Sequence, residues 1–220
     1  MTVRPTQTPR RRRAVRRDAL VNREKILTVA AGLMARRGRN VPLAEIAGAA
    51  GVGVGTFYRG YPDRTALLHA LEHRAYDLLV AALDRIAESG QTGADAVKAF
   101  LIACLELGDD LVLPLRGAPT LTDDAMAAAR QRIDGVLERF LAEGRADGSV
   151  RADVNATDVI MCGAMISQPL PHGPGFTTIA RRHICLFVRG IRARADQPLP
   201  GPPVTQDDIE EMFAGEPAAE

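Results

Sequence analysis

The sequence predicts an all-α protein with a small N-terminal domain and a larger helical body. Two observations favour this fold class. The stretch from Leu43 to Arg64 contains two short apolar-patterned segments joined by a tight turn, Ala50-Gly51-Val52. Through most of the remaining chain, apolar residues recur at the spacing of a helix, in segments interrupted by glycine and proline. Helices with one apolar stripe must bury it against other helices, so a helical bundle is expected.

The stretch around the turn has the pattern of a helix-turn-helix. Leu43, Ile46, Ala47 and Ala50 stand at i, i+3, i+4 and i+7, on one face of a helix. Gly51 follows where a helix ending in a left-handed residue favours glycine. The second segment, about 54–61, is too short to be stable alone and must pack on its neighbours. In such a pair the second helix can enter the major groove of DNA.

The same stretch resembles the DNA-binding signature of the TetR (tetracycline-repressor) family. The resemblance covers the first third of the chain and rests on these residues: Arg23 to Leu27, Ala30-Ala31, Gly38, Ala47, Ala50 to Val52, Gly55 to Tyr58, Tyr61 to Arg64 and Leu67-Leu68. It implies a homodimeric transcriptional repressor that binds a pseudo-palindromic operator in double-stranded DNA. It also implies a small-molecule effector that releases the DNA.

Charge supports a nucleic-acid partner independently of the resemblance. Residues 1–64 hold 14 Lys and Arg against 4 Asp and Glu, whereas the remainder holds 14 against 23. A basic first third on an acidic remainder is typical of a DNA-binding end joined to a body that does not bind DNA.

The residues expected to read bases are Val54, Gly55, Thr56 and Arg59. Arg59 is the best candidate for a bidentate pair with guanine, and the alternative is a phosphate contact, since phosphate bonds outnumber base bonds. By resemblance, Tyr58 and Arg64 contact phosphates.

Residues 1–17 are predicted to be a disordered basic arm, because they contain seven arginines and almost nothing apolar. The arm either contacts phosphates or the minor groove, or is a solvated tail that raises non-specific affinity. The arginines assigned to DNA are Arg12, Arg13, Arg16 and Arg17.

The remaining domains are placed at 18–64 for DNA binding, 65–195 for a helical regulatory and dimerisation domain, and 196–220 for a flexible tail. Asp63 is expected to cap a long helix, and Thr92 with Asp95 and Thr120 with Asp123 are expected to form capping boxes.

A helix over about 155–167 is apolar on most sides, so a small body needs a second subunit to bury it. By resemblance, the last two long helices pair across a two-fold axis. The interface residues expected are Gly163, Ala164, Ile184, Phe187, Val188 and Ile191.

A largely apolar effector is expected in the body, because Met adapts to varied shapes. The alternative is that the same residues are ordinary core, which is the commoner role of Met and Phe at helical spacing. The candidate lining residues are Phe100, Cys104, Met126, Phe140, Met161 and Met165.

Other functions are less well supported. No phosphate-binding glycine loop or nucleophile elbow occurs, so no enzyme and no cofactor are expected. His69 and His73 have a spacing that can bind metal, but without further ligands nearby no metal is expected. A thiol redox sensor using the three cysteines and a non-specific architectural DNA-binding protein remain alternatives. The sequence lacks an apolar run long enough for a membrane span, and a cytoplasmic location is expected.

Overall fold

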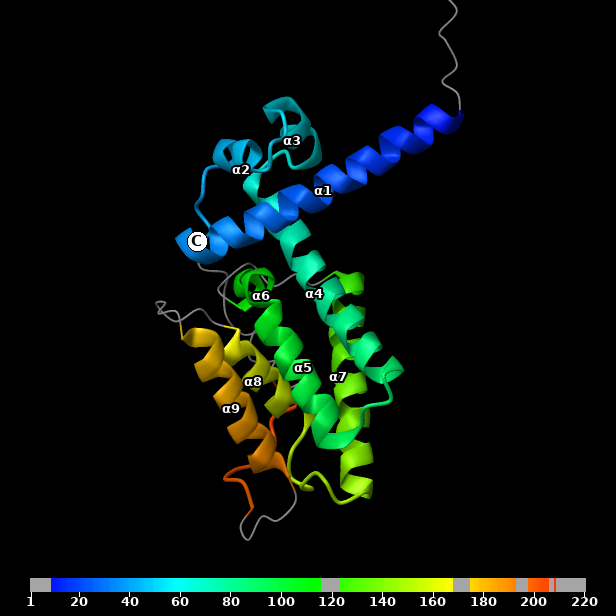
Figure 1. Ribbon diagram of the computed structural model, residues 1–220, viewed down its shortest axis with the longest axis vertical. Coiled ribbons are helices and arrows are strands. Elements are labelled where there is room, and N and C mark those ends of the chain that lie inside the picture. Colours follow the sequence, from blue (N-terminus) through cyan, green and yellow to red (C-terminus); the bar gives the residue numbers. More distant parts are fainter. Residues whose placement is uncertain (1–8, 116–122, 168–174, 193–197, 206–207, 209–220) are drawn as a thin grey trace, which may run out of the picture. The chain divides into compact units, whose positions relative to one another are not determined.

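The computed structural model describes residues 9–115, 123–167, 175–192, 198–205 and 208. All elements formed by these residues are helices, which confirms the predicted all-α fold class. The chain divides into two compact units, Met1–Leu71 and Glu72–Glu220 (Figure 1). The division falls inside α4 (Arg64–Glu88).

The first unit is built on α1 (Pro9–Arg37), which packs against α2 (Leu43–Ala49), and α2 in turn packs against α3 (Val54–Gly60). Its core contains the buried apolar residues of α1, Ile26, Leu27, Ala30, Ala31 and Met34, and Gly38 follows the helix with a positive φ of 83°. The fully buried side chains around it are those of Met34, Ile46 and Phe57. The helix order predicted from the sequence is therefore confirmed.

The sequence predicts a disordered basic arm over residues 1–17, whereas the structure has residues 9–17 as the first turns of α1. Residues 1–8 lie outside the described residues. Lack of apolar residues excludes an independent fold, but extending an existing helix needs no new nucleus. Arginine is a good helix former and proline is tolerated at the first helical position, so Pro9 can begin the helix. Figure 1 shows this part of α1 extending beyond α2 and α3.

The second unit is organised around α5 (Gly93–Glu106), which packs against α7 (Asp124–Ala146), α8 (Ala156–Ile166) and α9 (Phe176–Ile191). The short α6 (Gly108–Leu115) follows α5 directly (Figure 1). Apolar residues from α4 to α9 form one buried cluster around Leu101, Leu137 and Leu141. Among the described residues no helix is both long and apolar enough to cross a bilayer.

Two glycines bring α5 and α7 into backbone contact. Gly93 begins α5 with a positive φ of 55°, and a Cβ at this position would lie 3.1 Å from the Cα of Gly144 on α7. A Cβ on Gly144 would lie 2.8 Å from the Cα of Gly93. Only residues without side chains allow this approach.

Helix caps agree with the predictions in part. Asp63 caps α4, since its Oδ1 accepts a hydrogen bond from the backbone N–H of Ala66 at 2.8 Å. The capping box predicted at Thr92 does not form: the Thr92 side chain makes no hydrogen bond to the start of α5, and the next residue, Gly93, has a left-handed conformation. Asp123 caps α7, because its Oδ1 accepts a hydrogen bond from the N–H of Met126; Thr120, the other residue of the predicted box, lies outside the described residues.

Part of the predicted flexible tail is hydrogen-bonded to the segment before α8. The backbone N–H of Leu199 donates to Asp153 at 2.8 Å, and the side-chain amide of Asn155 donates to the carbonyl of Val204 at 2.7 Å. Arg151 also pairs with Asp153, and both interactions lower the pKa of that carboxyl group. Leu199 and Val204 therefore bond to the segment before α8, while residues 206–207 and 209–220 lie outside the described residues.

Candidate nucleic-acid interface

The turn between α2 and α3 is fixed by backbone hydrogen bonds. Gly51 has a φ of 62°, and its N–H donates to the carbonyl of Gly48 at 3.0 Å. The N–H of Val52 donates to the carbonyl of Ala47 at 3.0 Å. The carbonyl of Gly53 then accepts hydrogen bonds from the N–H groups of Thr56 and Phe57, which starts α3. The turn therefore has the geometry of a helix-turn-helix, with a glycine where a left-handed conformation is required.

Phe57 anchors α3 in the first unit. Its side chain is fully buried, and its ring centroid lies 5.7 Å from those of both Tyr58 and Tyr61. Tyr61 is also buried, and burial raises the pKa of its hydroxyl group. That hydroxyl has no hydrogen-bond partner among the described residues. Aromatic packing on one side of α3 leaves its other side free.

The residues predicted to contact DNA on α3 are all exposed. Val54 and Tyr58 expose 53% and 42% of their surface, and Gly55, Thr56 and Arg59 are exposed as well. An exposed valine on a short helix offers an apolar contact of the kind made with a thymine methyl group. The structure thus leaves five of the predicted residues exposed on a single short helix.

The Arg59 side chain folds back along α3. Its Nε donates to the carbonyl of Gly55 at 3.0 Å, and its Nη2 donates to Oγ1 of Thr56 at 3.1 Å. A guanidinium group has five N–H donors, so donors remain for a base or a phosphate. These two bonds hold the charge against the exposed face of the helix.

Arg64 has a structural interaction that the sequence did not indicate. Its Nη2 donates to the carbonyl of Val41 at 2.8 Å, and its Nη1 donates to the carbonyl of Arg39. These bonds join the start of α4 to the connection between α1 and α2. The phosphate contact expected of Arg64 stays a prediction.

Two further basic residues lie beside the motif without having been assigned to it. Arg37 forms an ion pair with Glu45 that joins α1 to α2, and the bond to Glu45 raises the pKa of Arg37. Lys25 is exposed on α1, and its Nζ would lie 3.2 Å from a Cβ built on Gly51. Lys25 therefore places a cation next to the turn, a position that only the packing of α1 on the motif reveals. Arg12, Arg13, Arg16 and Arg17 lie in the first turns of α1.

The six residues predicted to line an effector cavity do not share one environment. Phe100, Cys104, Met126 and Phe140 are buried, and three of them belong to the main core cluster. Met161 and Met165 instead expose 49% and 65% of their surface. These two methionines lie on the side of α8 opposite the one that packs on α5, and their place in an effector cavity stays a prediction.

The residues predicted for the dimer interface also differ in their burial, and the interface itself stays a prediction. Gly163 faces α5, since a Cβ there would lie 3.2 Å from Sγ of Cys104. Ile184, Val188 and Ile191 are buried in the core of their own chain, and Ala164 and Phe187 are half-buried. The large apolar residues left exposed on α8 and α9 are Met161, Met165, Ile179 and Leu186.

The alternative sites receive little support. Burial raises the pKa of Cys104 to about 12 and that of Cys162 to about 11, which disfavours the reactive thiolate, while Cys185 is exposed. His73 lies 3.2 Å from a carboxylate oxygen of Asp123. Within the described ranges, no group of three or more His, Cys, Asp or Glu side chains is arranged to hold a metal.

Two family models match the chain. The model described as "Bacterial regulatory proteins, tetR family" matches residues 26–71, which include α2 and α3. The model described as "Transcriptional regulator SbtR-like, C-terminal domain" matches residues 95–193. Both halves of the chain therefore match models of one family.

Individual relatives agree with this assignment. The HTH-type transcriptional repressor LfrR of Mycolicibacterium smegmatis is 36% identical over 86 residues, which are 39% of this chain and 46% of LfrR, so the match spans about half of that relative. A TetR regulatory protein from Mycobacterium vanbaalenii superposes with a TM-score of 0.59 at 27% identity, covering 81% of this chain and 99% of that protein. A TetR regulator from Streptomyces coelicolor superposes with a TM-score of 0.58 at 28% identity, covering 79% of this chain and 99% of that protein. The helix-turn-helix, the helical body and these matches together show that the chain belongs to the TetR family of transcriptional regulators.

Proposed function

We propose that the protein is a homodimeric transcriptional repressor whose α3 helices read a pseudo-palindromic operator. The observation that carries this proposal is the uncovered surface of α3, with Val54, Thr56, Tyr58 and Arg59 exposed together. A helix that is anchored by the buried Phe57 and has its remaining side chains exposed can enter the major groove. The basic first turns of α1 support contact with the phosphate backbone.

The exposed apolar residues of α8 and α9 support dimerisation. Met161 and Met165 are one turn apart on α8, and Ile179 and Leu186 are two turns apart on α9, so each helix presents an apolar stripe to solvent. Such stripes are typical of surfaces that a partner covers. A second copy of the chain would bury both stripes and would set two α3 helices about 34 Å apart, or a multiple of that distance, as successive major grooves require.

Release by a small molecule is part of this proposal. An effector can lower DNA affinity only if it binds the DNA-free arrangement of the dimer more tightly than the DNA-bound one. Family membership supports such a response. The buried positions of Phe100, Cys104 and Phe140 place the body's apolar residues in a packed core, so an effector there must displace core contacts.

DNA binding is tested by fluorescence anisotropy on DNA from upstream of the protein's own gene and on scrambled DNA, at about 150 mM salt. We expect tight binding to the first alone, with two subunits per site. Equal, salt-sensitive binding to both would favour the architectural alternative.

Dimerisation is tested by sedimentation of Leu186→Asp, with Val204→Asp as the control, since both residues are exposed and only Leu186 lies on α9. We expect the first variant to shift toward monomer and to lose operator affinity, and the second to behave as wild type. A dimeric Leu186→Asp protein would place the interface elsewhere.

A further inference from the structure

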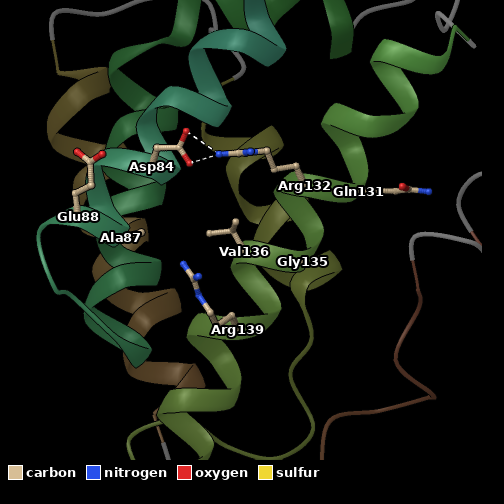
Figure 2. A pocket seen from close by; sticks show the side chains of 8 residues that line it. All are labelled: Asp84, Ala87, Glu88, Gln131, Arg132, Gly135, Val136 and Arg139. Carbon is tan, nitrogen blue, oxygen red and sulfur yellow. Dashed lines mark hydrogen bonds and ion pairs between the residues drawn. The ribbon is translucent and has the colours of Figure 1, made fainter.

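A hollow of about 580 Å³ lies on the second unit between the C-terminal half of α4 and the middle of α7. This volume is within the range of small-molecule sites. Figure 2 shows the residues around it. Its lining residues are Asp84, Ala87 and Glu88 from α4, and Gln131, Arg132, Gly135, Val136 and Arg139 from α7.

The middle of the hollow is apolar. Ala87 and Val136 supply methyl groups from opposite walls, and both are half-buried. Gly135 has no side chain, and a Cβ built on it would meet no atom within 4 Å. The space beside Gly135 is therefore open to the apolar body of a ligand.

The two arginines at the ends of the hollow differ in their partners. The guanidinium of Arg132 donates to both carboxylate oxygens of Asp84, at 2.7 and 3.0 Å. Arg139 points from α7 toward α4 (Figure 2), and none of the ion pairs formed among the described residues involves it. Its guanidinium carbon lies 5.5 Å from the ring centroid of Phe140. The carboxylate of Glu88 turns away from Arg139 in the same view.

We propose that this hollow binds a small organic carboxylate with an apolar body. The carboxylate pairs with the guanidinium of Arg139, a group whose planar donors fit two carboxylate oxygens. The apolar body lies on Ala87, Gly135 and Val136. A neutral ligand of the same shape would lack this ion pair, so the site favours negative charge.

Arg132 is available as a second contact because its bond to Asp84 is exposed. Arg132 and Asp84 expose 55% and 43% of their side-chain surface, and exposed ion pairs contribute little net stability. A ligand carboxylate can therefore replace Asp84 at little cost. That exchange removes an ion pair between α4 and α7.

The experiment uses the full chain and 2-naphthoate, whose own fluorescence reports binding, with the uncharged 2-naphthalenemethanol as the matched ligand. We expect saturable binding of the acid with one site per chain, and binding of the alcohol about tenfold weaker, because a charged hydrogen bond is lost. Equal affinity for the two ligands would overturn the proposal, as would the absence of saturable binding by the acid at millimolar concentration.

Variants assign the binding to this hollow. Arg139→Gln should weaken 2-naphthoate about tenfold, and Asp84→Asn should bind it at least as tightly as wild type because Arg132 is released. Arg85→Gln is the control, since Arg85 is exposed on α4 but does not line the hollow, and it should bind as wild type. Unchanged binding by Arg139→Gln, with a native circular dichroism spectrum, would place the acid elsewhere and refute the assignment.

Discussion

Replacing Gly93 with alanine tests how closely α5 and α7 pack. A Cβ at position 93 would lie 3.1 Å from the Cα of Gly144 and 2.7 Å from Oγ of Ser149. The serine side chain can rotate away, but the Cα of Gly144 belongs to a helix and cannot move alone. The substitution therefore forces α5 and α7 apart.

The free energy of unfolding should fall for two separable reasons. Gly93 has a φ of 55°, and an alanine in the left-handed region costs roughly 1–2 kcal/mol. Overpacking at a close contact costs roughly 1–3 kcal/mol more. Gly148 supplies the matched control, because its φ is 77° and a Cβ there would meet no atom within 4 Å. Gly148→Ala should therefore lower the free energy of unfolding only by the cost of the left-handed backbone conformation.

The assay is urea unfolding followed by circular dichroism at one fixed protein concentration, since dimerisation would couple stability to concentration. We expect Gly93→Ala to be less stable than Gly148→Ala by about 1–3 kcal/mol, with an unchanged denaturant dependence. Equal losses in the two variants would refute the argument, because they would show that α5 and α7 separate without loss of packing.

Three further predictions concern the first unit. Tyr61→Phe should raise the free energy of unfolding by about 1 kcal/mol, because it removes a buried hydroxyl without a partner; a loss in a thermal or urea melt would show that the hydroxyl is bonded. Arg59→Ala should relax specificity at one position per half-site at a cost of about 1–3 kcal/mol in a binding series over operator variants. A uniform loss over all sequences would assign Arg59 to a phosphate. Deleting residues 1–17 should reduce the salt dependence of operator binding measured by anisotropy, whereas an unchanged slope would mean that this segment does not contact DNA.

The helix-turn-helix could be predicted from the sequence because its signals are local. Gly51 marks the left-handed turn, and the spacing of Ile46, Ala47 and Ala50 places one face of α2 in the core. Phe57 follows at the position that anchors α3. These residues act within about fifteen positions of one another, so one sequence window contains both the turn and what it packs against.

The body could be predicted only as far as its helices. In α8 apolar residues occur on most sides, so periodicity alone does not say which side faces α5 and which faces solvent. The structure turns Gly163 toward Cys104 and leaves Met161 and Met165 exposed. On α9 it buries Ile184 and Val188 and leaves Leu186 exposed. Which apolar residues of α8 and α9 stay exposed therefore depends on how both helices pack on α5, which periodicity does not reveal.

The sequence by itself determined the helical class, the helix-turn-helix and the basic end of the chain, because helix periodicity, turn glycines and charge are properties of neighbouring residues. Only the tertiary structure decided which apolar faces stay exposed, how Arg64 joins α4 to the α1–α2 connection, and how Arg132 and Arg139 of α7 come to face α4 across the hollow. Each of these depends on residues far apart in the chain, and their positions are set by the packing of whole helices.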